Sequence, residues 1–136
     1  MDAGPVLNPA LDVDGIAKAF ARNRRVHIPE ILASDSAARV HRCLAQETQF
    51  SIVTRKDDGY VRLRPGAVLS PQEQGALMRN IYAQARDGFQ YLYDNHTMSN
   101  DGEPYHDPSH YLATVTDFVN SVTFLDLARR VTGSSA

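Results

Sequence analysis

The feature that most constrains the fold is a hairpin signal between residues 49 and 64. Apolar and polar side chains alternate from Phe50, a short loop ends at Gly59, and a second alternating run extends from Tyr60 to Arg64. A period of two is typical of a strand with one covered face, and a short loop ending in glycine joins antiparallel strands. The sequence therefore predicts a β-hairpin, so the fold must include an antiparallel sheet.

A further strand is predicted in residues 88–96, where aromatic side chains recur at every second position. An extended strand places Phe89, Tyr91 and Tyr93 on one face. A buried tyrosine needs a partner for its hydroxyl, so such a face lines either a core with a polar edge or a pocket. Tyr91 and Tyr93 are therefore the candidate wall of a pocket, and two purely structural tyrosines are the alternative.

Capping residues and helical periodicity predict five helices. Their expected starts are at Asp12 or Asp14, Ser34 or Asp35, Ser70, Asp107-Pro108, and Ser121 or Thr123. The stripes expected to be buried are Ile16, Ala19 and Phe20; Val40, Cys43 and Leu44; Leu77, Ile81 and Ala85; Leu112, Val115, Phe118 and Val119; and Phe124, Leu127, Ala128 and Val131. With a short edge strand expected over residues 25–29, the order is α-β-α-β-β-α-β-α-α. This order predicts an α+β fold with helices layered on a small, mostly antiparallel sheet.

Length and charge narrow the functional classes. A chain of 136 residues amounts to one domain or part of one, and we treat residues 1–136 as such. A net charge of -2, with both signs interspersed, gives no field that would attract nucleic acid or an anionic membrane. The lone Cys43 forms no intramolecular disulfide, and the N-terminus lacks the pattern of a signal peptide. We therefore expect a cytoplasmic protein with neither nucleic acid nor membrane as partner.

Histidines and a carboxylate gather between His96 and His110, with His106 and Asp107 between them. These are residue types that bind transition metals, so a metal protein using the three histidines is one hypothesis. Pro108 disfavours helical geometry at Asp107, so the histidines straddle a helix start, where turn and cap roles are the alternative. The usual nucleophile and phosphate-loop patterns do not occur in the sequence.

Four segments in order carry a resemblance to a known family: residues 7–12 with 20–32, residues 89–96, residues 117–121, and residues 124–133. They resemble the N-terminal half of bacterial iron(II)- and 2-oxoglutarate-dependent oxygenases of the prolyl-4-hydroxylase-like type. The resemblance implies that the sheet is the first part of a double-stranded β-helix, or jelly roll. It also implies a hydroxylase that uses Fe(II) and 2-oxoglutarate, with proline as one candidate substrate.

Members of that family bind iron through a His-x-Asp pair and a later histidine, a facial triad. No histidine of this chain is followed two residues later by Asp or Glu, and His106 has Asp107 one position too early. We therefore expect an N-terminal support segment whose partner is the missing iron-binding half, with no cofactor of its own and no activity alone. No residue of this chain is assigned as catalytic, cofactor-binding or metal-binding.

A noncatalytic interaction module is the alternative function. Without jelly-roll neighbours, the strands around Phe50 and Phe89 would expose an edge and an apolar face. Such surfaces recruit partners or self-associate.

Overall fold

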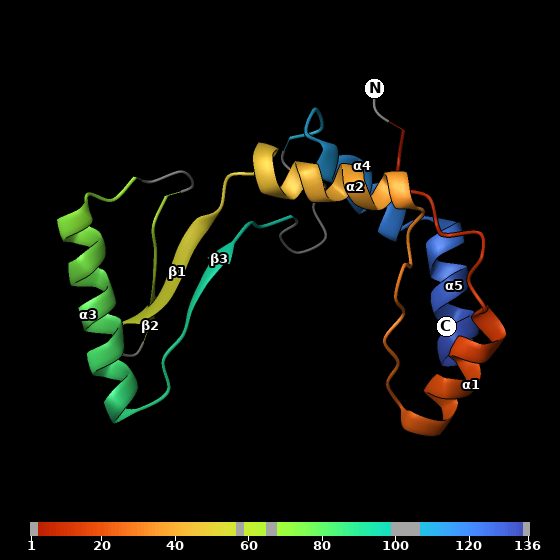
Figure 1. Cartoon of the computed structure of the whole chain (residues 1–136), viewed down its shortest axis with the longest axis horizontal. Helices are drawn as coiled ribbons and strands as arrows, with labels where there is room; N and C mark the ends of the chain where they lie inside the picture. The colour runs from red at the N-terminus through yellow and green to blue at the C-terminus, as the bar shows by residue number, and fades with distance from the viewer. Residues whose placement is uncertain (1–2, 57–58, 65–67, 99–106, 135–136) are drawn as a thin grey trace. The chain divides into compact units, whose positions relative to one another are not determined.

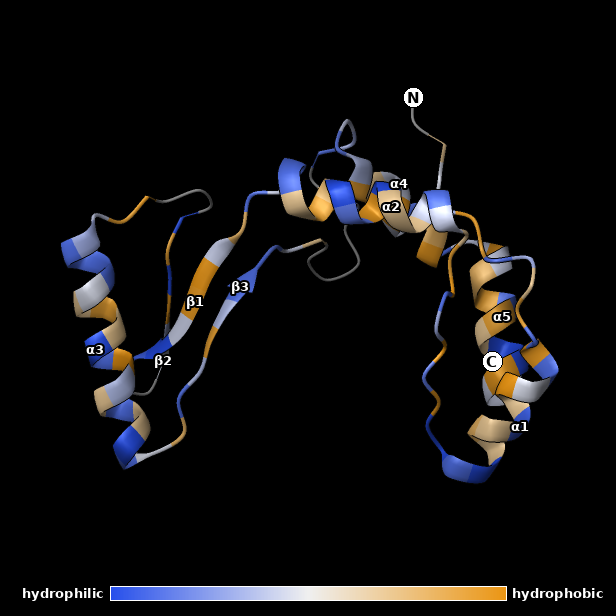
Figure 2. Cartoon of the chain, in the orientation of Figure 1, coloured by the Kyte–Doolittle hydropathy of each residue, from blue (hydrophilic) through white to orange (hydrophobic). Residues whose placement is uncertain are grey.

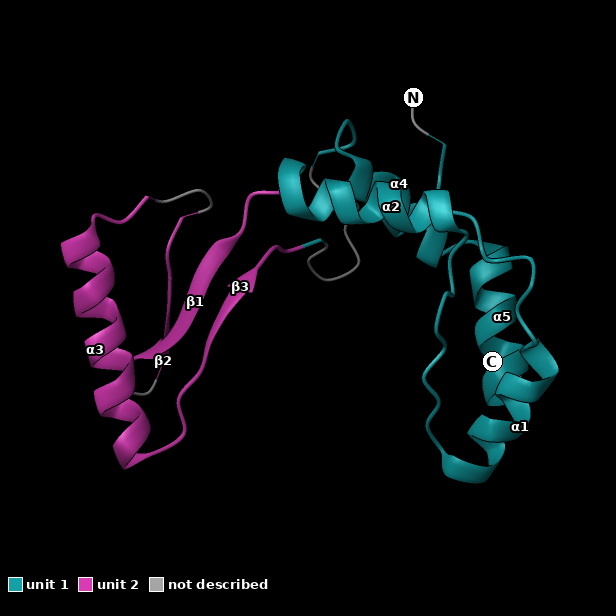
Figure 3. Cartoon of the chain, in the orientation of Figure 1, with its two compact units in different colours: residues 1–47, 98–136 teal, residues 48–97 magenta. Residues whose placement is uncertain are grey.

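A computed structural model describes residues 3–56, 59–64, 68–98 and 107–134. Within these residues the chain forms five α-helices, one π-helical turn and a three-stranded antiparallel sheet (Figure 1), which confirms the predicted α+β class. The chain divides into two compact units, residues 1–47 with 98–136 and residues 48–97 (Figure 3). We call them the helical unit and the sheet unit.

In the helical unit, α1 (Val13–Asn23) packs against α5 (Val122–Thr132). Asp12 caps α1 and Ser121 caps α5, as predicted, because each side chain accepts a bond from an otherwise unpaired backbone N–H of the first turn. Gly133 ends α5 in the left-handed region at φ 70°, which glycine adopts without a steric penalty. Local sequence signals therefore set both ends of α5.

The other helices of this unit enclose a small apolar core. Helix α2 (Ser34–Arg42) runs into the π-helical turn η1 (Cys43–Glu47), and α4 (Tyr111–Val119) supplies the facing residues. Cys43 has an exposed fraction of 0%, so its predicted place in the core is confirmed. The buried cluster consists of Cys43, Tyr111 and Leu112, with Val40, Met98, Ala113 and Val115 partly buried around it.

The prediction of a strand over residues 25–29 is wrong. The backbone takes positive φ at Arg24 (57°) and at Glu30 (52°), so the chain turns at both ends of this segment, and a proline within it cannot donate to a ladder. Pairing occurs just downstream instead, in an isolated antiparallel bridge between Leu7 and Leu32. The alternation of side chains was present, but no partner strand lies beside it among the described residues.

Two predicted helix starts and four predicted stripe residues also differ from the structure. Ala33, without a side-chain bond, precedes α2, and His110 rather than Asp107 caps α4. At η1 the wider π-turn rotates the side chain that follows Cys43 outward. The stripe residues found exposed are Leu44, Ala85, Val119 and Ala128.

The sheet unit contains β1 (Ser51–Lys56), β2 (Gly59–Arg62) and β3 (Leu92–Asn95) in the order β2-β1-β3. Lys56 pairs with Gly59, which confirms the predicted hairpin; its two connecting residues, 57 and 58, lie outside the described residues. The central strand carries the buried side chains of this sheet, and Figure 2 shows it hydrophobic along its middle.

Helix α3 (Pro71–Asp87) completes the sheet unit. Its predicted capping box is confirmed: the Ser70 backbone N–H donates to the Glu73 carboxylate at 2.8 Å, and the Glu73 N–H donates to the Ser70 hydroxyl at 3.3 Å. The Ser70 hydroxyl also donates to the Glu73 carboxylate at 2.7 Å, and this bond, followed by the one from the Ser70 N–H, lowers the pKa of the Glu73 carboxyl. Ile81 is the buried residue of the helix, and Gly88 ends it as predicted.

Candidate functional site

The three aromatic side chains predicted to share a face form a continuous row. The ring centroids of Phe89 and Tyr91 lie 6.0 Å apart, and those of Tyr91 and Tyr93 lie 5.5 Å apart. Tyr91 is half-buried, whereas Tyr93 is 49% exposed and Phe89 is 75% exposed. Their role as a pocket wall stays a prediction.

Strand β3 is shorter than the predicted strand because side chains, rather than a neighbouring strand, make the hydrogen bonds to the backbone of residues 89–91. The Thr54 hydroxyl donates to the Tyr91 carbonyl at 2.9 Å, and the Arg55 guanidinium donates to the Phe89 carbonyl at 2.8 Å. The Gln90 side-chain oxygen accepts from the Tyr91 N–H at 2.8 Å, and its NH2 donates to the Arg55 carbonyl. These bonds replace ladder bonds, so regular pairing begins at the next residue.

The strand register places basic side chains on the same face of the sheet as the aromatic row. Arg62 and Tyr93 lie opposite Val53 on the two neighbouring strands, and Tyr60 lies opposite Arg55. Residues paired across antiparallel strands share a face, so two arginines and two tyrosines surround the buried Val53. Guanidinium and phenol groups both donate hydrogen bonds, so this face suits a carboxylate or carbonyl ligand.

A hollow of about 230 Å³ lies at one end of this face. Its lining includes Arg55, Phe89, and the end of α3 at Gln84 and Asp87. This volume is below the range of roughly 300–1,000 Å³ typical of sites for small molecules. The hollow alone is therefore too small to define a substrate pocket.

His96, one of the candidate metal ligands, links the segments that flank β1 and β3. Its Nδ1 donates to the Gln49 carbonyl at 2.8 Å, and its ring meets Phe50 edge-on at 6.0 Å between centroids. This bond requires the proton on Nδ1. His96 thus has a structural role within the sheet unit.

His110 is held by bonds to both ring nitrogens. Nδ1 accepts from the Leu112 N–H at 3.2 Å, and Nε2 lies 3.2 Å from the Glu47 carbonyl oxygen. A carbonyl only accepts, so the proton of the neutral ring is on Nε2 and the lone pair is on Nδ1. The Cys43 sulfur lies 4.0 Å from the same Nδ1. In this arrangement His110 is the cap of α4 and has no lone pair left for a metal.

Charged groups surround His110 in a hollow of about 730 Å³. Arg39 makes two bonds of 3.0 Å to the Glu47 carboxylate, and its guanidinium carbon lies 4.0 Å from the centre of the Tyr111 ring. In the lining of the same hollow, the Ser109 hydroxyl donates to the Asp107 carboxylate at 2.6 Å. This bond, aided by the Ser109 N–H, is the main reason that the pKa of Asp107 is lowered.

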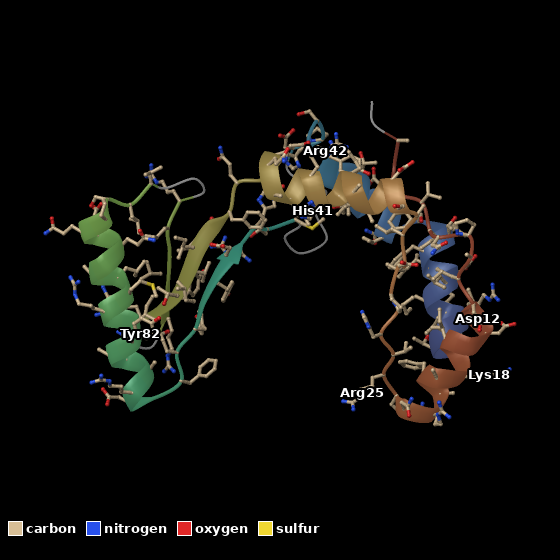
Figure 4. The ribbon with its side chains drawn as sticks, viewed as in Figure 1. Asp12, Lys18, Arg25, His41, Arg42 and Tyr82 are labelled. Atoms are coloured by element: carbon tan, nitrogen blue, oxygen red, sulfur yellow. The ribbon has the colours of Figure 1, made fainter. Side chains whose placement is uncertain are left out.

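The two remaining described histidines, His27 and His41, are exposed. His27 lines an open hollow of about 880 Å³ beside Asn23 and Arg25, and His41 is exposed on α2 (Figure 4 labels Arg25 and His41). His106 lies outside the described residues. Within the described residues, no three His, Cys, Asp or Glu side chains are grouped so that they could hold a metal ion.

Two features of these sites were missed in the sequence. The arginine and tyrosine face was partly detectable, because a two-residue hairpin loop at Lys56 and Gly59 fixes which residues of β1 and β2 are opposite. The cap formed by His110 had no such signal, because histidine is not among the residues preferred at that position.

No helix within the described ranges is long and apolar enough to cross a membrane. Comparisons with protein-family models, with curated proteins and with solved structures found no match to this chain.

Proposed function

We propose that residues 1–136 are the N-terminal support segment of an iron(II)- and 2-oxoglutarate-dependent oxygenase of the prolyl-4-hydroxylase-like type. In this proposal the sheet unit is the first part of a jelly roll that continues beyond β2 and β3. The ordered sequence resemblance motivates the proposal. The observation that carries it is the pair of open sheet edges.

Both outer strands of the sheet pair, among the described strands, only with β1. On and beside β3, large apolar side chains remain in solvent: Leu92 is 42% exposed, Tyr93 49% and Phe89 75%. Natural sheets cover or charge such edges, because exposed strands with apolar side chains associate with other chains. Further jelly-roll strands would pair this edge and bury these side chains.

The described residues do not fit the iron of the family. They contain no group of three ligands, and His110 uses both ring nitrogens in capping α4. In the proposed enzyme, the other half would hold iron, which would activate dioxygen as the oxidant, and 2-oxoglutarate, which would supply two electrons on its decarboxylation to succinate. The contribution of this chain would be mechanical support, with Tyr91 and Tyr93 as a wall of the site.

The test is reconstitution. We would purify residues 1–136 alone, and also together with a jelly-roll half from an enzyme of this type that contains the His-x-Asp pair. Iron-dependent succinate release is expected only from the pair, which should also sediment as a one-to-one complex. Succinate release from residues 1–136 alone would refute the proposal.

Matched variants would show whether the β3 edge is responsible for complex formation. Leu92→Asp and Tyr93→Asp place a charge on β3 and should abolish complex formation. Tyr82→Asp changes a tyrosine of α3 that is 66% exposed and should leave the complex intact (Figure 4). A complex that tolerates both β3 variants would show that association does not use this edge.

A noncatalytic interaction module is the second candidate, and the same exposed edge favours it. In that case the chain would self-associate through β3 without any oxygenase half. Sedimentation of residues 1–136 alone over a wide range of concentrations distinguishes the two. Self-association that Leu92→Asp removes would support the module, whereas a monomer at every concentration would exclude it.

A further inference from the structure

We propose that the outer edge of β3 binds an antiparallel strand that carries a basic residue opposite Asp94 and an apolar residue opposite Leu92. This strand would belong to the missing half of the oxygenase, so the inference rests on the proposed function. It specifies the direction, the register and the side-chain chemistry of the strand that pairs with β3.

Hydrogen bonds of β1 show which way its backbone groups point. In an antiparallel sheet, the N–H and the C=O of one residue point to the same neighbouring strand, and those of the next residue point to the other side. The Leu63 N–H, just after β2, donates to the Ile52 carbonyl at 2.9 Å, so Ile52 points toward β2. Val53 and Arg55 therefore point toward β3, and the Arg55 carbonyl accepts from the side chain of Gln90, which precedes β3, at 3.1 Å.

The same alternation assigns the two sides of β3. Tyr93 is paired with Val53, so the N–H and C=O of Tyr93 point inward to β1. The N–H and C=O groups of Leu92 and Asp94 point outward, where β3 has no neighbour among the described strands (Figure 1). Two donors and two acceptors are thus aligned for one further strand, which is the arrangement through which sheets take up an extended segment.

An antiparallel partner fits these groups. In antiparallel pairing, each outward residue exchanges both of its bonds with the one residue opposite, and such pairs are slightly more stable per residue than parallel ones. Both existing strand pairs of this sheet are antiparallel. Three consecutive residues of the partner would therefore face Asp94, Tyr93 and Leu92, in that order.

The exposed side chains of β3 set the chemistry of the partner. Leu92 is 42% exposed, and an apolar residue opposite would remove its surface from water. Asp94 is exposed, and among the described residues no basic side chain pairs with its carboxylate. Opposite charges across an antiparallel pair attract and like charges repel, so a lysine or arginine fits opposite Asp94. Tyr93, on the other face, suits a β-branched or aromatic residue.

A second copy of this chain does not supply that chemistry. Residues 88–95 contain no lysine or arginine. Two copies that paired through β3 would therefore leave each Asp94 without a counter-charge. The edge favours a strand of different sequence.

Amide hydrogen exchange of the full chain tests the direction of the backbone groups. The protection factor of the Tyr93 N–H, which bonds to β1, should exceed those of Leu92 and Asp94 roughly tenfold, the equivalent of one net hydrogen bond. Equal protection of the three, or the reverse order, would overturn the proposal, because the outward groups would then not be those of Leu92 and Asp94.

Three blocked eight-residue peptides, identical except for three central residues, test the chemistry of the partner. Their centres are Lys-Val-Val, Val-Val-Lys and Glu-Val-Val, and the blocked ends remove the terminal charges. Titration of the full chain, followed by the amide chemical shifts of β3, should show Lys-Val-Val binding roughly threefold tighter than the other two. Val-Val-Lys has the same composition, so it controls for nonspecific attraction. Equal affinity for Lys-Val-Val and either control, or no binding by any peptide, would overturn the proposal.

A charge reversal on β3 tests the contact with Asp94. In Asp94→Lys the preference should invert, so that Glu-Val-Val binds tighter than Lys-Val-Val. Asp117→Lys is the matched control, because it changes the net charge equally at an exposed position of α4, and it should leave the preference unchanged. A preference for Lys-Val-Val that persists in Asp94→Lys would refute the contact.

These peptides contain no oxygenase half, so their binding does not depend on succinate release. Failed reconstitution together with the expected peptide preference would refute the proposed function and support the strand. Successful reconstitution without that preference would refute this strand and leave the proposed function standing.

Discussion

The helical unit and the sheet unit are stabilised in different ways. The helical unit buries an apolar cluster at Cys43, Tyr111 and Leu112, and a second pair of buried side chains in α5. The sheet unit buries Val53 and Ile81 but also the polar Ser51 and Thr54, while four of its aromatic side chains remain exposed: Tyr60, Tyr82, Phe89 and Tyr93.

The difference shows that the sheet unit leaves more of its apolar side chains in solvent than the helical unit does. Exposed apolar area costs free energy in water, at about 25 cal/mol per Å². The sheet unit compensates with bonds from side chains to backbone, such as those made by Gln90 and Arg55. We infer that the helical unit is the more self-sufficient of the two and that the sheet unit gains more from an added partner.

Leu112→Ala should have the largest effect, because it empties a site that is 2% exposed in the core. We expect the free energy of unfolding to fall by about 2–5 kcal/mol. Denaturant titration followed by residue-resolved NMR would show the loss in the helical unit. Leu125→Ala in α5, where the leucine is 38% exposed, is the control and should cost far less. Equal losses from both variants would contradict a core centred on Leu112.

Gln90→Ala tests whether polar bonds hold the sheet unit together. The variant removes donors to the Arg55 carbonyl and the Gln84 side chain, and the acceptor of the Tyr91 N–H. We expect a loss of about 1–3 kcal/mol, seen as faster amide exchange in β1 and β3. Gln72→Ala on the exposed side of α3 should leave those amides unchanged. An unaffected sheet in Gln90→Ala would mean that apolar contacts dominate in both units.

Ser70→Ala should remove the cap of α3 and cost about 1 kcal/mol. Ser34→Ala is the matched control, because Ser34 opens α2 without a side-chain cap at its preceding residue. Thermal unfolding of both variants would compare the loss of a serine that caps a helix with the loss of one that does not. A similar change in the two melting temperatures would refute the role of the capping box.

The same cap predicts a pH dependence. The Ser70 hydroxyl lowers the pKa of Glu73, so the folded state favours the carboxylate. Its contribution is complete above the ordinary value of 4.5 and is lost as the pH falls through the lowered folded-state value. Unfolding measured at a series of acidic pH values should show this loss in the natural chain and a smaller one in Glu73→Gln. A parallel pH profile in the two proteins would rule out this linkage.

Arg130→Ala should have the smallest effect. Arg130 of α5 pairs with Asp14 of α1 at 3.2 Å, but the two side chains are 62% and 82% exposed. Exposed ion pairs contribute little, so we expect a change below about 1 kcal/mol. A double-mutant cycle with Asp14→Ala would measure it, and a larger coupling would show that α1 and α5 depend on this pair rather than on Leu127.

Local features of the fold could be predicted from the sequence, and distant pairings could not. The capping box at Ser70 and the hairpin loop ending at Gly59 involve residues close in the chain, and both were found as expected. The pairing of Val53 with Tyr93 joins strands far apart in sequence, and periodicity alone does not choose a partner. The segment 25–29 failed for the same reason, since alternation was present without a partner.

The candidate site was predictable to a similar extent. The spacing of Tyr91 and Tyr93 was enough to predict adjacent rings, because alternation fixes the face of a strand. The exposure of the two rings depends on which other segments cover that face, and a local sequence pattern does not predict those segments. The cap at His110 depends on Glu47, 63 residues away, so it required three-dimensional information.

The π-helical turn at Cys43–Glu47 makes the chain length in this segment critical. A π-turn accommodates one residue more than an α-helical turn, so deleting one residue there would let the helix continue in regular form. Such a deletion would preserve helicity while rotating Glu47 away from both Arg39 and His110. Insertions and deletions in this segment should therefore be tolerated less than substitutions at Leu44, which already faces solvent.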